Sequence, residues 1–292
     1  MKYEIMKELS DEYSIEKMAK HLKVSRQAYY NWQRGKTYNV SSQELKLREA
    51  IVKVFNKSRQ SYGAKRVSNE LKIQGYACGK FKTKRIMNIL NLSPKASKKY
   101  KVTTDSNHKF EVAPNILDRD FTATAPNKKW VSDITYIYTG EGWLYLCVII
   151  DLYSRLIVGW SVSDRMKKDL VLDTLKKAYK ARKPESGLIF HSDRGSQYCA
   201  HEVRNFLNEN QIVQSMSRKG NCWDNAVSES FFHTLKIEYL YGINIETRKL
   251  ARLMIFDYIE TFYNKNRQHS YLDYLTPDKF EQLYLRDIMM CA

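Results

Sequence analysis

The sequence predicts an α/β protein in which a five-stranded mixed sheet with helices is preceded by two all-α helix-turn-helix units. Two observations lead to this fold class. Residues 10–92 show only helical spacing of apolar side chains, broken by short turns. Residues 130–237 hold five apolar segments of strand length, which alternate with helical stretches in the order βββ-α-β-α-β-α. The expected domains are helical units at 1–38 and 42–93, a linker at 94–126, a core at 127–240 and a helical extension at 241–292.

The positive charge of the chain is concentrated in one region. The 292 residues carry a formal net charge of +17, and residues 51–110 alone hold 15 basic and 2 acidic side chains. A solvated protein face usually mixes both signs. We therefore interpret this stretch as a surface for a polyanion, with a basic face that only aids solubility as the alternative.

Other bulk properties exclude several classes of protein. No apolar run approaches the length that spans a membrane, and the first residues lack the apolar centre of a signal peptide. We therefore expect a cytoplasmic protein with no membrane partner. The five cysteines are scattered and form no Cys-x-x-Cys pair. This spacing argues against a disulfide framework and against a cysteine zinc site.

The first helical unit has the pattern of a helix-turn-helix. Its first helix repeats apolar residues on one face, at Ile15, Met18, Ala19 and Leu22. After a tight corner, Ser25 is placed to cap a second helix that runs through Trp32. In such a unit the second helix enters the major groove, so we expect DNA contacts from Arg26, Gln27 and Tyr29. The alternative is a helical hairpin that serves only for packing.

The second helical unit repeats this pattern over a longer stretch. Apolar spacing predicts one helix between Leu45 and Phe55, a second through Val67, and a third that begins near Lys82. Basic side chains gather at the beginnings of the second and third helices. We expect contacts with DNA phosphates and grooves from Lys65, Arg66, Lys80, Lys82, Lys84 and Arg85. Two such units in tandem predict recognition of an extended DNA site.

The core is expected to begin with an antiparallel meander of three strands. These strands are the apolar segments 130–137, 143–150 and 156–162. Two shorter strands follow at 188–190 and 212–216, each after a helical stretch. The last helix of the core continues from Ala226 to Ile237, and Asp224 is placed to cap it. Further helices are predicted over 245–285, where they would pack on the core.

Three acidic residues interrupt this apolar pattern. Asp133 lies in the first strand, Asp193 ends the fourth, and Glu229 lies on the last helix of the core. A carboxylate on a buried strand is costly unless a positive charge compensates it. A divalent cation is the usual compensation, and oxygen ligands suit Mg²⁺ or Mn²⁺. We therefore predict that these three acids converge in the fold and form a catalytic metal site.

The spacing of these acids resembles that of a known group of enzymes. Glu229 follows Asp193 by 36 positions, and Lys236 follows Glu229 by seven, two helical turns further on. This pattern resembles that of the DDE transposases and retroviral integrases, whose catalytic core is RNase H-like. Four longer stretches are similar to the OrfB transposases of the bacterial IS-three family, at residues 130–136, 191–198, 224–232 and 263–270.

The resemblance implies a DNA transposase that binds insertion-sequence ends and catalyses strand cleavage and strand transfer. Two Mg²⁺ or Mn²⁺ ions per active site would be held by the three acids. The implied partners are double-stranded DNA, as terminal inverted repeats and as target, and further copies of the chain in a homodimer or larger assembly on the nucleoid. Near the acids, DNA contacts are expected from Arg194, Arg218, Lys219, Trp223 and Lys236. Trp223 would either stack on a splayed base or anchor its loop on the core.

Two other functions are compatible with parts of the sequence. An RNase H-like nuclease would hydrolyse DNA without joining strands, and the two DNA-binding units argue against it. A catalytically silent DNA-binding regulator would retain an inactive core, and the acids at all three positions argue against that. A strand-transfer assay with marked DNA ends distinguishes both from a transposase.

Overall fold

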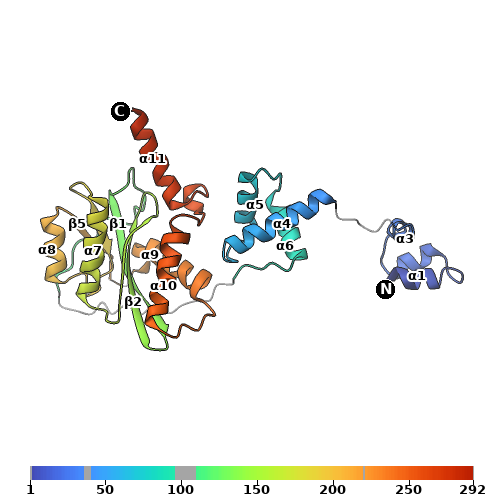
Figure 1. Cartoon of the computed structure of the whole chain (residues 1–292), viewed down its shortest axis with the longest axis horizontal. Coiled ribbons are helices and arrows are strands. Elements are labelled where there is room, and N and C mark those ends of the chain that lie inside the picture. Colours follow the sequence, from blue (N-terminus) through green and yellow to red (C-terminus); the bar gives the residue numbers. More distant parts are fainter. Residues whose placement is uncertain (1, 36–40, 96–109, 220, 292) are drawn as a thin grey trace. The chain divides into compact units, whose positions relative to one another are not determined.

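The computed structural model of the chain describes residues 2–35, 41–95, 110–219 and 221–291 (Figure 1). It divides into two compact units, residues 1–52 and 53–292. The division falls within helix α4 (Ser42–Lys57), whereas the sequence predicted a boundary between residues 38 and 42. A long helix can belong to both units because its hydrogen bonds are internal, so domain boundaries need not coincide with helix ends.

The first unit contains three short helices, α1 (Lys2–Glu8), α2 (Ile15–His21) and α3 (Arg26–Gln33), before α4 begins. Serine side chains cap two of them: Ser14 accepts from the Lys17 amide and Ser25 from the Ala28 amide. The unit is held by a small core of Met6, Met18, Ala19 and Tyr29.

Tyr29 belongs to this small core, so the prediction that its side chain contacts DNA is wrong. Its side chain is only 1% exposed, and its ring lies 6.1 Å from that of Trp32 and 6.3 Å from that of Tyr3. The physical reason is the size of the unit. Helices of seven or eight residues supply few large apolar side chains, and this tyrosine is one of them.

The second unit begins with the end of α4, which is followed by helices α5 (Ala64–Ile73) and α6 (Lys80–Ile89). Helices α5 and α6 bury Val67, Leu71, Ile86 and Met87. This helical segment is attached to the C-terminal region of the chain by polar contacts. The Tyr62 hydroxyl accepts from the Gln268 amide at 2.6 Å, and Arg59 pairs with Asp257 at 2.8 Å.

A five-stranded mixed sheet forms the centre of the second unit, as the sequence predicted. Its strands are β1 (Lys129–Thr139), β2 (Gly142–Asp151), β3 (Ile157–Ser163), β4 (Ile189–Ser192) and β5 (Val213–Met216). Their order is β3-β2-β1-β4-β5. The first three strands are antiparallel neighbours, whereas β4 runs parallel to β1 and β5 parallel to β4.

Helices cover both faces of this sheet (Figure 1). One face carries α7 (Lys168–Arg182) and α8 (His201–Glu209), and the other carries α9 (Ala226–Leu235) and α10 (Arg248–Phe256). Each face has its own apolar core, because alternate side chains of a strand point to opposite sides. No helix in the described part of the chain is both long enough and apolar enough to span a bilayer.

The remaining elements are short or irregular helices. A 3-10 turn, η1 (Cys222–Asn225), precedes α9, and π-helical segments follow α9 at η2 (Lys236–Leu240) and α10 at η3 (Asp257–Tyr263). A second 3-10 turn, η4 (Ser270–Leu272), leads to the final helix α11 (Pro277–Cys291). The predicted helical character of 245–285 is therefore confirmed, with π-helical and 3-10 interruptions.

The second half of the predicted linker packs on the core. The amides of Ile116 and Leu117 donate to the Ser215 hydroxyl, and the Met216 amide donates to the Pro114 carbonyl. Leu117 is 2% exposed and belongs to the apolar core shared with α9 and α10. Residues 96–109 of the predicted linker lie outside the described residues. The segment near Leu117 is thus a structural part of the core.

Candidate active site

Asp133 lies on β1 and faces the side of the sheet that carries α9. Val131 and Ile137, at even spacings from Asp133 along the strand, belong to the apolar core between the sheet and α9. Trp130 belongs to the core on the opposite face. The Ile134 amide donates to Asp133 Oδ1 at 2.8 Å. Strand alternation therefore directs this carboxylate toward the helix that bears Glu229.

Asp193 follows directly on β4, at the same level of the sheet as Asp133. Val131 pairs with His191 in the parallel register of β1 and β4, an offset of 60 residues, and Asp133 and Asp193 keep the same offset. Neighbouring strands lie about 4.8 Å apart. The chain turns after Asp193, whose Oδ1 accepts from the Gly195 amide at 3.0 Å. A Cβ at residue 195 would lie only 3.0 Å from that oxygen. Glycine at this position therefore avoids a steric clash with the Asp193 carboxylate.

The charge of Asp193 acts on the carboxylate of Asp133. Burial raises the pKa of Asp133 well above its ordinary value, and the charge of Asp193 raises it further. The charge of Glu229 acts in the same direction more weakly, and the ammonium group of Lys236 opposes both. Paired carboxylates whose charged forms are destabilised in this way are hard oxygen donors that a divalent cation would stabilise. Asp133 and Asp193 therefore fit an Mg²⁺ or Mn²⁺ ion.

Glu229 lies in the first turn of α9, which packs on β1. The beginning of this helix is attached to the strand by Asn225, whose Nδ2 donates to the Ser132 carbonyl at 3.3 Å. Two buried polar atoms here, Asn225 Oδ1 and Ser228 Oγ, make no hydrogen bond with any described residue. Glu229 itself is exposed, and partial burial raises the pKa of its carboxylate.

The three carboxylates do not form a closed set of ligands in this structure. Within the described ranges, no group of three or more His, Cys, Asp or Glu side chains is arranged to hold a metal ion. The fold brings Asp133 and Asp193 to one level of the sheet and places Glu229 on the helix above the same strand.

Lys236 lies beside this group of acids. It is the first residue of η2, and its ammonium nitrogen is 4.7 Å from the centre of the Tyr136 ring on β1. Burial lowers the pKa of Lys236, and the negative charge of Asp133 raises it. The helix widens to π geometry at this residue, a feature that often accompanies functional sites.

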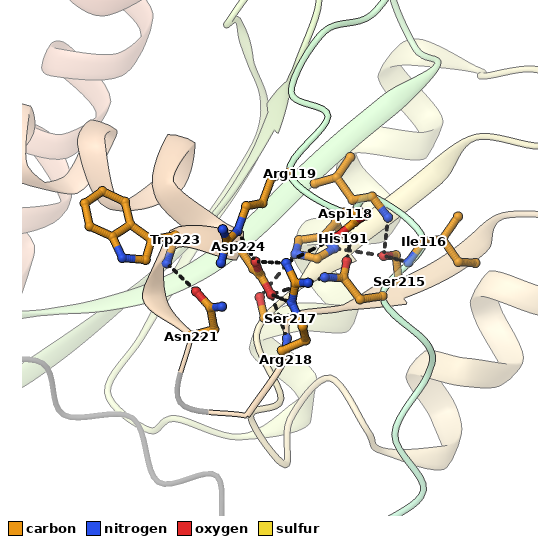
Figure 2. Close-up of polar contacts among 12 residues, drawn as sticks. Ile116, Asp118, Arg119, His191, Ser215, Ser217, Arg218, Asn221, Trp223 and Asp224 are labelled. Carbon is orange, nitrogen blue, oxygen red and sulfur yellow. Dashed lines mark hydrogen bonds and ion pairs between the residues drawn. The ribbon is translucent and has the colours of Figure 1, made fainter.

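Asp224 is the centre of a polar network that sequence analysis did not find (Figure 2). Its buried carboxylate accepts hydrogen bonds from the Arg218 amide and guanidinium, from Arg119 Nε at 2.8 Å and from Asn115 Nδ2 at 3.1 Å. The Arg218 guanidinium holds the pKa of this carboxyl well below its usual range. The predicted capping role is wrong, because Asn225 occupies the N-cap position and Asp224 lies in η1.

His191 forms a buried chain of hydrogen bonds next to Asp193 (Figure 2). Its Nδ1 is 2.9 Å from Ser215 Oγ and its Nε2 is 3.1 Å from Ser217 Oγ. Because Ser215 Oγ already accepts two backbone amides, its proton goes to Nδ1, and we assign the remaining ring proton to Nε2. Burial lowers the pKa of His191 to about 4, although the charge of Asp224 acts in the opposite direction.

The other residues predicted to contact DNA near the acids lie around the same loop. Arg194 Nε donates to the Ser217 carbonyl at 2.6 Å, and Arg218 pairs with Asp118 at 3.2 Å as well as with Asp224. Lys219 is exposed. Trp223 is 69% exposed, and its indole points away from Asp224 (Figure 2). The ring is therefore placed to meet a ligand, and the alternative of an anchor on the core is not supported.

The predicted DNA contacts of the helical segments are mostly exposed. Lys65, Lys80, Lys82, Lys84 and Arg85 all lie at the surface. Arg26 is paired with Glu16 at 3.5 Å, and Gln27 donates to Asn31 on its own helix. Arg66 differs, because it lies 3.6 Å from Glu238 and over the Tyr62 ring. These contacts give Arg66 an internal structural role.

Comparison with known proteins places this arrangement in a family. An HTH-like domain model matches residues 42–100, and integrase core domain models match residues 123–222 and 229–285. The transposase InsF of insertion sequence IS3A from Escherichia coli (strain K12) is 41% identical over 286 residues, which cover 96% of this chain and 98% of that protein. The 31 kDa protein of insertion element IS600 from Shigella sonnei is 42% identical, covering 89% and 96%.

Among solved structures, a chain of the simian T-cell lymphotropic virus intasome aligns with a TM-score of 0.47 and 16% identity, covering 73% of this chain and 70% of that chain. The sequence similarity is far stronger than this. Because identity of about two residues in five extends over nearly the full length of both proteins, the chain belongs to the IS3 family of insertion-sequence transposases, whose InsF members it resembles throughout.

Proposed function

We propose that this transposase cleaves and joins DNA strands at a site formed by Asp133, Asp193 and Glu229, which together hold two Mg²⁺ or Mn²⁺ ions. The observation that carries the proposal is the register of β1 and β4, which pairs Val131 with His191 and so leads toward Asp133 on β1 and Asp193 directly after β4. Asp133 is an acid whose charged form is destabilised by burial and by the charge of Asp193, so it has no stabilising role in the apolar core. The position of these two acids is understandable as the ligand set of a cation.

When bound, paired divalent cations activate a water or a DNA 3′-hydroxyl for in-line attack at phosphorus and stabilise the leaving oxygen. Asp133 is held by β1, and Asp193 by the turn after β4, where its Oδ1 accepts from a backbone amide, and both would serve as metal ligands in this scheme. Glu229 joins them through a small movement of α9 on β1 when DNA is present. Lys236, beside Tyr136 and Asp133, is placed to meet a phosphate of the scissile strand. The protein forms no covalent intermediate in this scheme.

The DNA partners follow from the same scheme. Cleavage at insertion-sequence ends needs recognition of terminal inverted repeats, which we assign to the helical segments before the core. Joining requires target DNA and the pairing of two ends, so we expect at least two copies of the chain on the DNA. The protein would then reside on the nucleoid.

A strand-transfer assay tests this function. A duplex carrying a terminal repeat with a labelled 3′ end is incubated with a plasmid target in Mg²⁺. Wild-type protein should join the label to the plasmid. Asp193→Asn should lower the rate at least about a thousandfold, since it removes several kcal/mol of charge stabilisation, whereas Asp173→Asn, an exposed acid on α7, should not. Hydrolysis without joining by the wild type would instead identify a nuclease.

A further inference from the structure

A cleft of about 580 Å³ lies at the edge of the helical segment 53–95. One side is formed by the beginnings of α5 and α6, and the other by the segment 270–274 near the C-terminus. We propose that this cleft binds a sugar–phosphate unit of the DNA backbone, so that segment 270–274 is part of the DNA-binding surface. The inference rests on the proposed function only in taking DNA as the ligand.

The charge of the cleft favours an anion. Lys65, Lys80 and Lys84 line it and are exposed, and none of the described residues that line it is acidic. The ammonium nitrogen of Lys65 lies 5.2 Å from the centre of the Tyr274 ring, so this lysine spans the two sides. Lysine ammonium groups around one concave site attract phosphate oxygens and release counterions from DNA.

Backbone amides add to this charge. Helix α5 has Gly63 at its N-cap and α6 has Gly79, and neither helix begins with a side-chain cap hydrogen bond. The first residues of both helices, Ala64 and Lys80, line the cleft. Uncapped amides at a helix N-terminus are donors suited to a phosphate. Two such termini and three lysines therefore converge on the same space.

Gly63 leaves space in front of the first amides of α5. Its φ of −78° is accessible to any residue, and a Cβ at this position would meet no protein atom within 4 Å. Neither backbone conformation nor internal packing therefore requires glycine here. Because Gly63 itself lines the cleft, a missing side chain leaves the amides of α5 open to close approach by another molecule.

The segment that leads to the opposite wall is attached to the helical segment 53–95 by two hydrogen bonds of Gln268. The Gln268 amide donates to the Tyr62 hydroxyl at 2.6 Å, and Gln268 Nε2 donates to Glu70 at 2.8 Å. Tyr274 has a φ of +63°, a conformation that costs energy for a tyrosine and persists only where surroundings impose it. The apolar residues Met87, Leu92 and Pro94 give the cleft a surface for the sugar, and its volume lies within the range of small-ligand sites.

Substitution of Ser270 tests whether this wall belongs to the DNA site. Ser270 lines the cleft from the C-terminal side and is exposed. We expect Ser270→Glu to weaken binding of duplex DNA about tenfold or more, for terminal-repeat and unrelated duplexes alike, and to lower the slope of log K against log salt concentration by about one. Ser186→Glu, at an exposed serine outside the cleft, should bind within about twofold of the wild type. The measurement is fluorescence anisotropy in EDTA.

A second pair of variants keeps the test independent of Ser270. Lys84→Glu, in the cleft, should weaken binding about tenfold, whereas Lys72→Glu, exposed on α5 outside the cleft, should not. If Ser270→Glu and Lys84→Glu both bind like the wild type, the cleft is not a DNA site. Equal losses for Lys84→Glu and Lys72→Glu would also overturn the proposal. Because binding in EDTA does not use the acids, failure here leaves the strand-transfer test of the proposed function unaffected.

Discussion

Arg218 donates three hydrogen bonds to the carboxylate of Asp224, one from its backbone amide and two from its guanidinium, at 2.9–3.0 Å. Asp224 also accepts from Arg119, so its carboxylate joins the second half of the predicted linker, the loop after β5 and the turn before α9. The buried carboxylate of Asp224 therefore fixes the turn η1, from which α9, the helix that carries Glu229, begins. The position of that helix should depend on the network.

Replacing the buried carboxylate tests this dependence. We expect Asp224→Asn to lower the free energy of unfolding by about 2–3 kcal/mol. The reason is that Arg119 is left without its carboxylate partner and Arg218 with only the exposed Asp118. Strand transfer should also fall, because the turn before α9 loses its attachment. Urea denaturation measures the first effect. Asp118→Asn is the control: its carboxylate also contacts Arg218 but is 72% exposed, so its loss should change stability by no more than about 1 kcal/mol.

The buried histidines make stability depend on pH. The pKa of His191 is lowered to about 4 and that of His269 to about 3, whereas an unfolded chain titrates near 6.5. Between pH 6.5 and 4 the unfolded chain therefore binds more protons, so stability should fall as the pH is lowered through this window. The share of His191 is about 3 kcal/mol at pH 4.

His191→Gln should remove one of these two proton-linked steps. The slope of unfolding free energy against pH between 4.5 and 6 should then decrease by up to about 1.4 kcal/mol per pH unit, although the variant is less stable at neutral pH. Urea titrations at several pH values measure this slope. An unchanged slope in the variant would show that His191 is already protonated in the folded protein.

Glu238, which lies in η2, forms a buried ion pair with Arg267. Two guanidinium nitrogens of Arg267 donate to Glu238 at 2.8 Å, and the side chains are only 5% and 12% exposed for Arg267 and Glu238. Glu238→Gln should cost about 3–5 kcal/mol, because it leaves a buried cation unpaired. Glu185→Gln breaks the exposed pair with Lys128 and should cost less than about 1 kcal/mol. Similar losses in both variants, measured by thermal unfolding, would contradict this account.

Local patterns were sufficient to predict the sheet and the places of Asp133 and Asp193 relative to its strands. Each strand of the core is an apolar segment bounded by turns, and the order of strands and helices restricts the topology to very few possibilities. Asp133 and Asp193 could be located because each interrupts such a segment. Their shared level follows from parallel pairing, which is a property of the fold.

Contacts between distant residues could not be predicted in the same way. Asp224 was interpreted as a local cap because no signal in the sequence links it to Arg119, which lies 105 residues away. Arg66 was predicted to contact DNA because basic residues surround it in the sequence. In the fold it lies beside Glu238 of η2, which is far from it along the chain. From its position on α3, Tyr29 could either contact a DNA groove or pack in the core of the first unit. It packs in the core, because this small unit has few other large apolar side chains.

Binding of Mn²⁺ to the protein on a terminal-repeat duplex tests the central claim most directly, because Mn²⁺ can be counted by electron paramagnetic resonance. The account predicts two bound ions per active site for the wild type and a loss of at least tenfold in affinity for Asp133→Asn, Asp193→Asn and Glu229→Gln. Asp173→Asn should bind like the wild type. Equal Mn²⁺ binding by the wild type and all three acid variants would contradict the claim that these carboxylates act together.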